Sequence, residues 1–122
     1  MIGTLGEVIL YVEDMPKQVR FYRDVLGLKV IDPADSDPGD AYWVLLDCGA
    51  CQLALHGGGE RRFGEDAPKI VFMVDDIQAA RDELVRKGVP AGDTFSPAPG
   101  VSVVNCTDPE GNKFSLEKRD SK

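Results

Sequence analysis

The chain has 122 residues and a formal net charge of −7, with 14 Lys and Arg against 21 Asp and Glu. This length is enough for one domain with a sizeable core, and the acidic balance disfavours nucleic acid and anionic membranes as partners, because both require a basic surface. Since the chain has neither an apolar run long enough to cross a bilayer nor a charged-then-apolar leader, we expect a cytoplasmic protein.

The first half predicts a β-α-β-β-β module over residues 1–58. The apolar run at 7–12, bounded by acidic residues, favours a buried strand. Asp14 is suited to cap a helix that Gly27 ends, and Pro16 is tolerated in its first turn. Further strands are expected at 28–31, 42–46 and 52–55, with a solvated loop at 32–40 and a hairpin turn at 48–51.

The second half predicts the same order of elements over residues 68–118. A strand at 69–74 precedes a helix at 75–87, which Gly88 ends. We expect a weak strand at 89–91, a loop at 93–100 and a hairpin of strands at 101–106 and 113–116, followed by a frayed tail. The glycine-rich stretch at 56–68 is interpreted as a connector, or as a flap whose tip is Arg61, Arg62 and Phe63.

The two halves repeat each other. Glu7–Met15 is echoed 62 residues later by Lys69–Ile77, and Asp47–Leu55 is echoed 61 residues later by Asp108–Leu116. Two offsets that agree this closely predict a duplicated module. We therefore expect an α+β fold and a single domain over residues 1–122, in which two tandem βαβββ modules form a curved mixed sheet around a shared cavity.

The three cysteines do not predict a disulfide framework, because their number is odd and the chain lacks a secretory leader. Cys48 and Cys51 have the spacing of a redox or zinc motif. A redox site would sit at a helix start, and a structural zinc site would need a second pair of ligands. The preferred interpretation is a hairpin turn with two small residues.

Three motifs resemble those of a known family: Val12-Glu-Asp-Met15, Phe21-Tyr-Arg-Asp-Val-Leu-Gly-Leu28, and Asp108-Pro-Glu-Gly-Asn112 before the last strand. Together with the tandem βαβββ order, they make residues 7–117 similar to the vicinal oxygen chelate superfamily. That superfamily includes glyoxalase I, bleomycin-resistance proteins, fosfomycin-resistance enzymes and extradiol dioxygenases. The resemblance implies the fold given above and a homodimer, but it does not choose an activity, because one fold hosts many chemistries.

In the metal-using members, the resemblance implies four ligand positions, which here hold Glu7, Ala54, Lys69 and Ser115. Only Glu7 suits a divalent ion, since Ala54 has no donor, Lys69 is a cation and Ser115 is a poor ligand. We therefore expect no metal and no cofactor. One hypothesis is that Glu7 and Lys69 form an ion pair where the metal would stand; the other is that both lie at exposed strand starts and never meet.

Alternation along the strands indicates which side chains share the face of these four positions. The predicted ligand-binding residues are Glu7, Ile9, Tyr11, Trp43, Ala54, His56, Lys69, Val71, Met73 and Ser115. Tyr42 and Trp43 are neighbours on one strand, so one of the two is expected to face inward. A mostly apolar face with a few polar groups is typical of a small-molecule site.

The function predicted from these features is metal-independent binding of a small organic molecule, of the sequestration or resistance type. The alternative is a lyase, isomerase or dioxygenase-like enzyme of the same family with a non-standard or relocated metal site. Its candidate catalytic residues are Glu7 and His56, the only histidine. For His56, a solvated or capping role is the competing interpretation. A partner-regulated module without chemistry is a third hypothesis.

Overall fold

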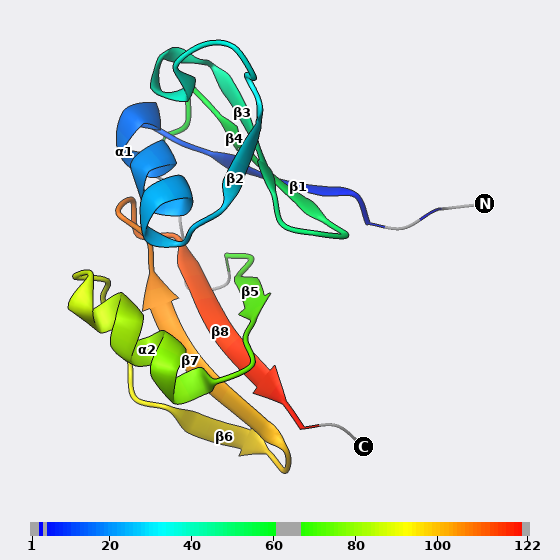
Figure 1. Ribbon diagram of the computed structural model, residues 1–122, viewed down its shortest axis with the longest axis vertical. Helices are drawn as coiled ribbons and strands as arrows, with labels where there is room; N and C mark the ends of the chain where they lie inside the picture. The colour runs from blue at the N-terminus through cyan, green and yellow to red at the C-terminus, as the bar shows by residue number, and fades with distance from the viewer. Residues whose placement is uncertain (1–2, 4, 61–66, 121–122) are drawn as a thin grey trace. The chain divides into compact units, whose positions relative to one another are not determined.

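The computed structural model describes residues 3, 5–60 and 67–120, and the chain divides into two compact units, Met1–Arg62 and Phe63–Lys122. Each unit has its own sheet and its own helix (Figure 1). No helix in the described ranges is long and apolar enough to cross a membrane. The tip of the predicted flap, Arg61 to Phe63, lies outside the described residues.

The strands of the two units follow the same order, which confirms the duplicated βαβββ prediction. In the first unit, the strands are β1 (Glu7–Tyr11), β2 (Lys29–Asp32), β3 (Trp43–Asp47) and β4 (Gln52–His56), in the order β1-β4-β3-β2. In the second, they are β5 (Ile70–Met73), β6 (Phe95–Ala98), β7 (Val101–Thr107) and β8 (Lys113–Arg119), in the order β5-β8-β7-β6. The first and last strands of each unit pair in parallel, and the other pairs are antiparallel.

The helix of the first unit begins and ends at the predicted residues. Helix α1 (Met15–Val19) continues directly into the π-helical segment η1 (Arg20–Val25), and a 3-10 turn, η2 (Pro38–Asp40), lies in the loop before β3. The Asp14 carboxylate accepts a hydrogen bond from a first-turn amide, which satisfies one of the donors that a helix start leaves open. Gly27, with φ of +80°, turns the chain out of the helix.

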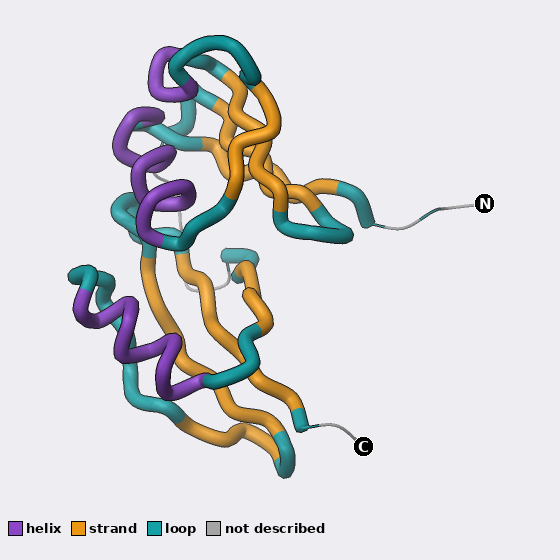
Figure 2. The backbone as a smooth tube through the Cα atoms, in the orientation of Figure 1, coloured by secondary structure: helices purple, strands orange, loops and turns teal. Residues whose placement is uncertain are grey.

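The helix of the first unit lies against one face of its sheet (Figure 2). The buried apolar side chains of this unit come from both elements. Val44 and Leu46 on β3 and Leu53 and Leu55 on β4 are buried on this face, as alternation requires, whereas Ala54 between the two leucines is buried on the opposite face. The buried apolar residues of this unit are Val12, Met15, Val19, Phe21, Tyr22, Val44, Leu46, Leu53, Ala54 and Leu55. Removing such apolar surface from water stabilises the fold by about 25 cal/mol per Å², and this is the main force that holds the sheet to the helix.

The second unit repeats this plan. Helix α2 (Ile77–Arg86) is capped by Asp76, whose carboxylate accepts a hydrogen bond from the Ala79 amide at 3.0 Å. The helix packs on β7 and β8 and buries Leu84. The buried strand residues of the second unit are Val103, Val104, Cys106, Phe114, Ser115 and Leu116.

Two segments of the second unit differ from their predictions. The edge strand is Phe95–Ala98, which the sequence predicted as a loop, whereas the predicted strand at 89–91 makes only a single bridge, from Ala91 to Cys106. Pro97 obscured this strand, but a proline is tolerated at a sheet edge because its missing N–H has no partner to lose there. The last strand also continues to Arg119, which lies opposite Val101, where fraying was expected.

The two hairpin turns have the predicted character. At the Cys48–Cys51 turn, the Gln52 side chain accepts a hydrogen bond from the Cys48 amide at 2.8 Å and donates one to the Gly49 carbonyl at 3.1 Å. Both cysteines are free thiols, as is Cys106. The segment is therefore a turn tied by its own residues rather than a disulfide.

The corresponding turn of the second unit is built around one buried carboxylate. Asp108 accepts hydrogen bonds from the amides of Glu110 and Asn112, each at 2.9 Å, and from the Asn112 side-chain nitrogen at 2.7 Å. Gly111 supplies the positive φ, of +85°, that the turn requires. The motif that carries the family resemblance is thus a self-contained structural turn.

Candidate functional site

The predicted site residues of the first unit share one face of its sheet. Strand pairing places Glu7 beside Gln52, Ile9 beside Ala54, and Tyr11 beside His56. Trp43 lies on the other side of His56, in register with it. Alternation puts these side chains on the face opposite the core of the unit. The prediction of a shared face holds for this half of the set.

Four aromatic side chains gather at one end of this face, and we call them the aromatic cluster: Tyr11, Tyr42, Trp43 and His56. The His56 ring lies 4.8 Å from Tyr11, 5.1 Å from Tyr42 and 6.1 Å from Trp43, between ring centroids. Tyr11 and Tyr42 are 58% and 65% exposed, so their rings remain open to a ligand. The sequence predicted that only one of Tyr42 and Trp43 would face this site, but both contact His56.

Glycines fix the position of Tyr42 in this cluster. The Gly57 amide donates a hydrogen bond to the Tyr42 carbonyl at 2.8 Å, and a Cβ on Gly57 would come within 2.9 Å of the Tyr42 ring. A Cβ on Gly58 would collide with the Tyr42 hydroxyl. The glycine run, predicted as a connector, therefore also makes room for an aromatic ring. This run is the sequence signal that could have identified Tyr42.

The backbone sets the protonation pattern of His56. Its Nδ1 lies 2.7 Å from the Gly57 carbonyl oxygen, which can only accept a hydrogen bond, so Nδ1 carries a proton and donates it. Nε2 is then left to exchange a hydrogen bond with a ligand. No described residue forms a hydrogen bond with Nε2.

Glu7 and His56 lie at opposite ends of the strand pairing. Glu7 is level with Gln52, whereas His56 is four residues further along the same strand, a separation of about 13 Å at the usual rise per residue. That distance is too long for the two side chains to share a metal ion or a proton. The structure therefore does not bring the two candidate catalytic residues together.

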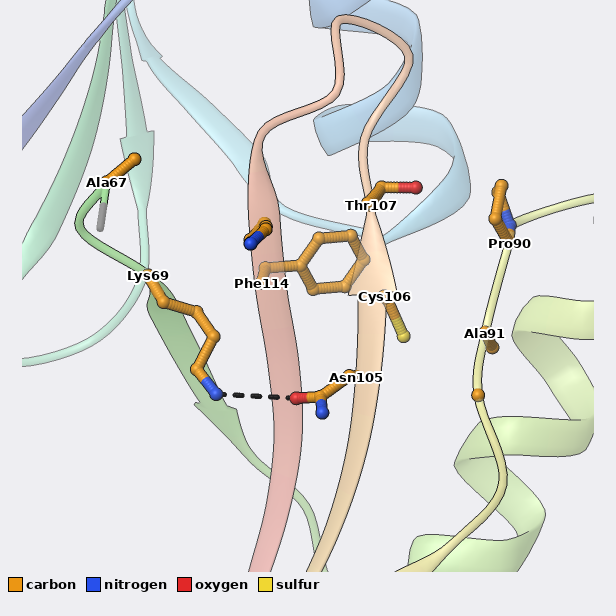
Figure 3. Close-up of a pocket in the computed structure, with 10 residues that line it drawn as sticks. Ala67, Lys69, Pro90, Ala91, Asn105, Cys106, Thr107 and Phe114 are labelled. Atoms are coloured by element: carbon orange, nitrogen blue, oxygen red, sulfur yellow. Dashed lines mark hydrogen bonds between the residues drawn. The ribbon is translucent and has the colours of Figure 1, made fainter. Parts of the chain in front are cut away.

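The predicted residues of the second unit also share one face. Val71 lies beside Ser115 in the pairing of β5 and β8, and Met73 lies two residues further on. Val71 and Met73 are exposed, whereas Ser115 is buried. The Lys69 ammonium donates a hydrogen bond to Asn105 Oδ1 at 3.3 Å, so its side chain crosses the face of β8 to reach β7 (Figure 3). Glu7 and Lys69 belong to different units, and their ion pair stays a prediction.

A cavity of about 700 Å³ opens beside this lysine, in a size range typical of small-molecule sites. It is lined by Ala67, Lys69, Pro90, Ala91, Gly92, Asn105, Cys106, Thr107, Lys113 and Phe114 (Figure 3). Apart from Lys69, none of these residues is among the predicted ligand-binding residues, although alternation with Ser115 indicates Lys113 as a cavity candidate. The segment 89–91 was predicted as a weak strand, which hid its place beside the cavity, and alternation on one strand could not show which β7 residue Lys69 reaches.

Cys106 lines this cavity but has little nucleophilic character. Burial raises the pKa of the Cys106 thiol, with a smaller opposing influence from Arg81. Burial likewise raises the pKa of Cys48 in the first unit. Since the thiolate is the reactive form, neither residue is suited to nucleophilic catalysis at neutral pH.

The four positions that the resemblance assigns to metal ligands do not offer a suitable donor set. Ala54 is buried and has no donor atom. The Lys69 ammonium, already a hydrogen-bond donor to Asn105, has no lone pair for a metal. Ser115 is buried and its hydroxyl is a poor ligand. Within residues 3, 5–60 and 67–120, no three His, Cys, Asp or Glu side chains form a cluster that could hold a metal ion.

Known structures share this fold across nearly the whole chain. A putative glyoxalase family protein from Bacillus anthracis has a TM-score of 0.78 and 18% identity, covering 98% of both chains. The antibiotic binding protein TnmS3 from Streptomyces sp. CB03234 has a TM-score of 0.76 and 21% identity, with 98% of each chain covered. Lactoylglutathione lyase from Agrobacterium tumefaciens has a TM-score of 0.74 and 22% identity, covering 96% of this chain and 94% of its own. At these identities the likeness concerns the fold.

Curated proteins gave no match to the sequence. A family model does match it, over residues 4–116, and its description agrees with the resemblance that the motifs predicted. The match spans both βαβββ units and all eight strands begin within it. The chain therefore belongs to the Glyoxalase/Bleomycin resistance protein/Dioxygenase superfamily.

Proposed function

We propose that this protein binds a planar aromatic small molecule without using a metal ion, as a sequestration or resistance protein does. The observation that carries the proposal is the aromatic cluster, in which three rings surround His56 on the open face of the first sheet. Ile9, which is exposed, extends the same face with apolar surface.

The cluster suits a flat ligand for physical reasons. Aromatic pairs stabilise offset-stacked or edge-to-face contacts by about 0.5–1.5 kcal/mol beyond the burial of their surface. Tyr11 and Tyr42 together leave large ring surfaces exposed, and covering them with a ligand removes apolar surface from water. Nε2 of His56 supplies one polar contact that can orient the ligand.

We propose that binding uses no metal ion because the residues at the family's ligand positions lack suitable donor atoms. Ala54 and Lys69 remove two of the four donors that the family resemblance requires. The antibiotic-binding neighbour TnmS3 supports the proposal only as an example that this fold can hold an antibiotic. No reaction step is needed for sequestration.

One observation favours the enzymatic alternative. Because Nδ1 of His56 donates its proton to a backbone carbonyl, Nε2 is the ring nitrogen that could act as a general base. A lyase or isomerase of this kind would bind the same ligand and deprotonate it, with Tyr11 and Trp43 as walls of the site. A His56→Gln variant separates the two functions, because it should abolish turnover, which needs the base, but only weaken sequestration, which keeps the three neighbouring rings.

We also propose that the protein acts as a homodimer in the cytoplasm, and that residues 1–58 and 68–118 are modules of a single domain with a shared cavity. Each sheet has two edge strands, β1 and β2 in one and β5 and β6 in the other. Open edges are sites of unwanted pairing, and a partner copy would cover them. Size-exclusion chromatography with light scattering tests this proposal, and a monomer at all concentrations would contradict it.

The binding proposal can be tested with the fluorescence of Trp43, the only tryptophan of the chain. Quinoline-type and anthraquinone-type compounds serve as probes, titrated in excess EDTA. We expect quenching to saturate, and Tyr11→Ala to weaken binding by about tenfold, the loss of roughly one ring contact. Phe95→Ala is the matched control, because Phe95 is an exposed aromatic on a strand of the other unit.

Two results would contradict the proposal. One is binding that EDTA abolishes, because the ligand would then require a metal. The other is an equal loss of affinity in Tyr11→Ala and Phe95→Ala, because the aromatic cluster would then play no specific part.

A further inference from the structure

We propose that the second unit carries a separate site for a small organic anion, in the cavity beside Lys69. The cavity lies wholly on residues of Phe63–Lys122, whereas the aromatic cluster lies wholly on Met1–Arg62. The site therefore goes beyond the proposed function and does not depend on it.

The polar groups that line this cavity are hydrogen-bond donors. Lys69 and Lys113 each bring an ammonium group, and Thr107 brings a hydroxyl. Lys113 and Thr107 lie opposite each other in the pairing of β7 and β8. A cavity whose side chains mainly donate hydrogen bonds suits a ligand that accepts them. The two positive charges favour an anionic ligand.

Asn105 adds a further donor. Because an ammonium group can only donate, the Asn105 oxygen must be the atom that faces Lys69, at 3.3 Å (Figure 3). The amide NH₂ group is then directed elsewhere, and no described residue accepts a hydrogen bond from it. The Lys69–Asn105 bond thus holds the lysine across the sheet and turns a second donor group toward a ligand.

Neither lysine forms an ion pair with a described residue of its own unit. The ion pairs of the described part of this unit use other cations, namely Arg81, Arg86, Lys87 and Arg119. Glu117 is on the same strand as Lys113, but its carboxylate is paired with Arg119. In a chain of net charge −7, two lysines without a paired carboxylate among the described residues of their unit form a local positive region.

The remaining lining sets the shape of the ligand. Pro90 and Ala91 contribute apolar surface, and the volume of about 700 Å³ exceeds what an inorganic ion would fill. An organic carboxylate or phosphate with an apolar body satisfies both features. Lysine binds either group as a point charge, so the shared chemistry is the anion itself.

The site can be tested by NMR on ¹⁵N-labelled protein, with benzoate as the anionic probe and benzyl alcohol as its neutral counterpart. We expect benzoate to shift the amide signals of Lys69, Asn105, Thr107 and Lys113, and benzyl alcohol to bind there about tenfold more weakly. Raising the salt from about 0.05 to about 0.5 M should weaken benzoate binding, because it shortens the range over which the lysines attract it.

Substitutions separate charge from other effects. Lys69→Gln and Lys113→Gln should each weaken benzoate binding by about threefold to fivefold, with little change for benzyl alcohol. Lys118→Gln is the matched control, because Lys118 is exposed on the same strand but faces the other side of the sheet. All three lysines are exposed, so the variants should fold, and their amide spectra report this directly.

Three outcomes would overturn the proposal: equal binding of the two probes, an affinity that neither Lys69→Gln nor Lys113→Gln lowers, or an equal loss in Lys118→Gln. Shifts confined to Tyr11, Trp43 and His56 would also overturn it. In that last case the proposed function would stand, since the probe would have bound at the aromatic cluster instead.

Discussion

The two units share a strand order but present different chemistry on the faces opposite their cores. In the first unit, the pairs along this face are Glu7 with Gln52, Ile9 with Ala54, and Tyr11 with His56. In the second, Val71 pairs with Ser115 and Met73 with Glu117, with Lys69 and Lys113 just before them. One face is rich in aromatic rings and the other in donor groups.

The core faces differ much less. Leu53 and Leu55 on β4 correspond to Phe114 and Leu116 on β8, and all four are buried. Substitution there changes packing and costs stability, whereas substitution on the open face changes only what can bind. The comparison shows how one duplicated scaffold can hold two unlike surfaces.

The largest expected effect concerns two aspartates at equivalent turn positions. Asp108 is buried and accepts three hydrogen bonds, whereas Asp47 is exposed and its carboxylate accepts one, from Gly49. We expect Asp108→Ala to lower the free energy of unfolding by about 3 kcal/mol and Asp47→Ala by less than about 1 kcal/mol. Chemical denaturation of both variants measures the difference, and equal losses would show that the turns are energetically alike.

A smaller effect is expected at two glycines of the first unit. Gly58 and Gly49 both have positive φ, of +82° and +88°. A Cβ on Gly58 would meet Tyr42, whereas a Cβ on Gly49 would meet open space. Gly58→Ala should therefore cost about 2–3 kcal/mol and change Trp43 fluorescence, against about 1 kcal/mol for Gly49→Ala without a spectral change. If the two variants had identical Trp43 fluorescence spectra, the glycine run would not position the aromatic cluster.

The smallest expected effect compares one thiol from each unit. Cys106 is buried and its pKa is raised by burial above the ordinary 9.0, whereas Cys51 is partly exposed. We expect iodoacetamide to label Cys51 at least about tenfold faster at neutral pH. Since the thiolate reacts, labelling of Cys106 should keep rising as the pH passes 9.0. Mass spectrometry of timed samples measures both rates, and equal rates would place Cys106 in solvent.

The sequence was sufficient for the architecture and for which residues share a face. The repeated pattern from Glu7 and from Lys69 predicted both sheets, because alternation fixes side chains on either side of a strand. It missed β6, because Pro97 argues against a strand unless the strand is already known to be an edge.

Alternation along single strands could not predict which side chains contact each other across strands. The Lys69 bond to Asn105 joins residues 36 positions apart, and only the register of β5, β8 and β7 brings them together. Tyr42 precedes β3, outside any alternation, and its place beside His56 depends on the room left by Gly57 and Gly58. Sites that depend on register and on close backbone approach need the structure.

The parallel pairing of first and last strands also governs the order in which each unit can form. Within the described sheets, β1 pairs with β4 alone and β5 pairs with β8 alone. The hairpins β3–β4 and β7–β8 close short loops and can form early, but β1 and β5 must wait for strands that begin 45 and 43 residues after them. During synthesis, β1 therefore has no complete partner strand within its sheet until His56 has left the ribosome. The N-terminal strand of each unit is the last to be secured.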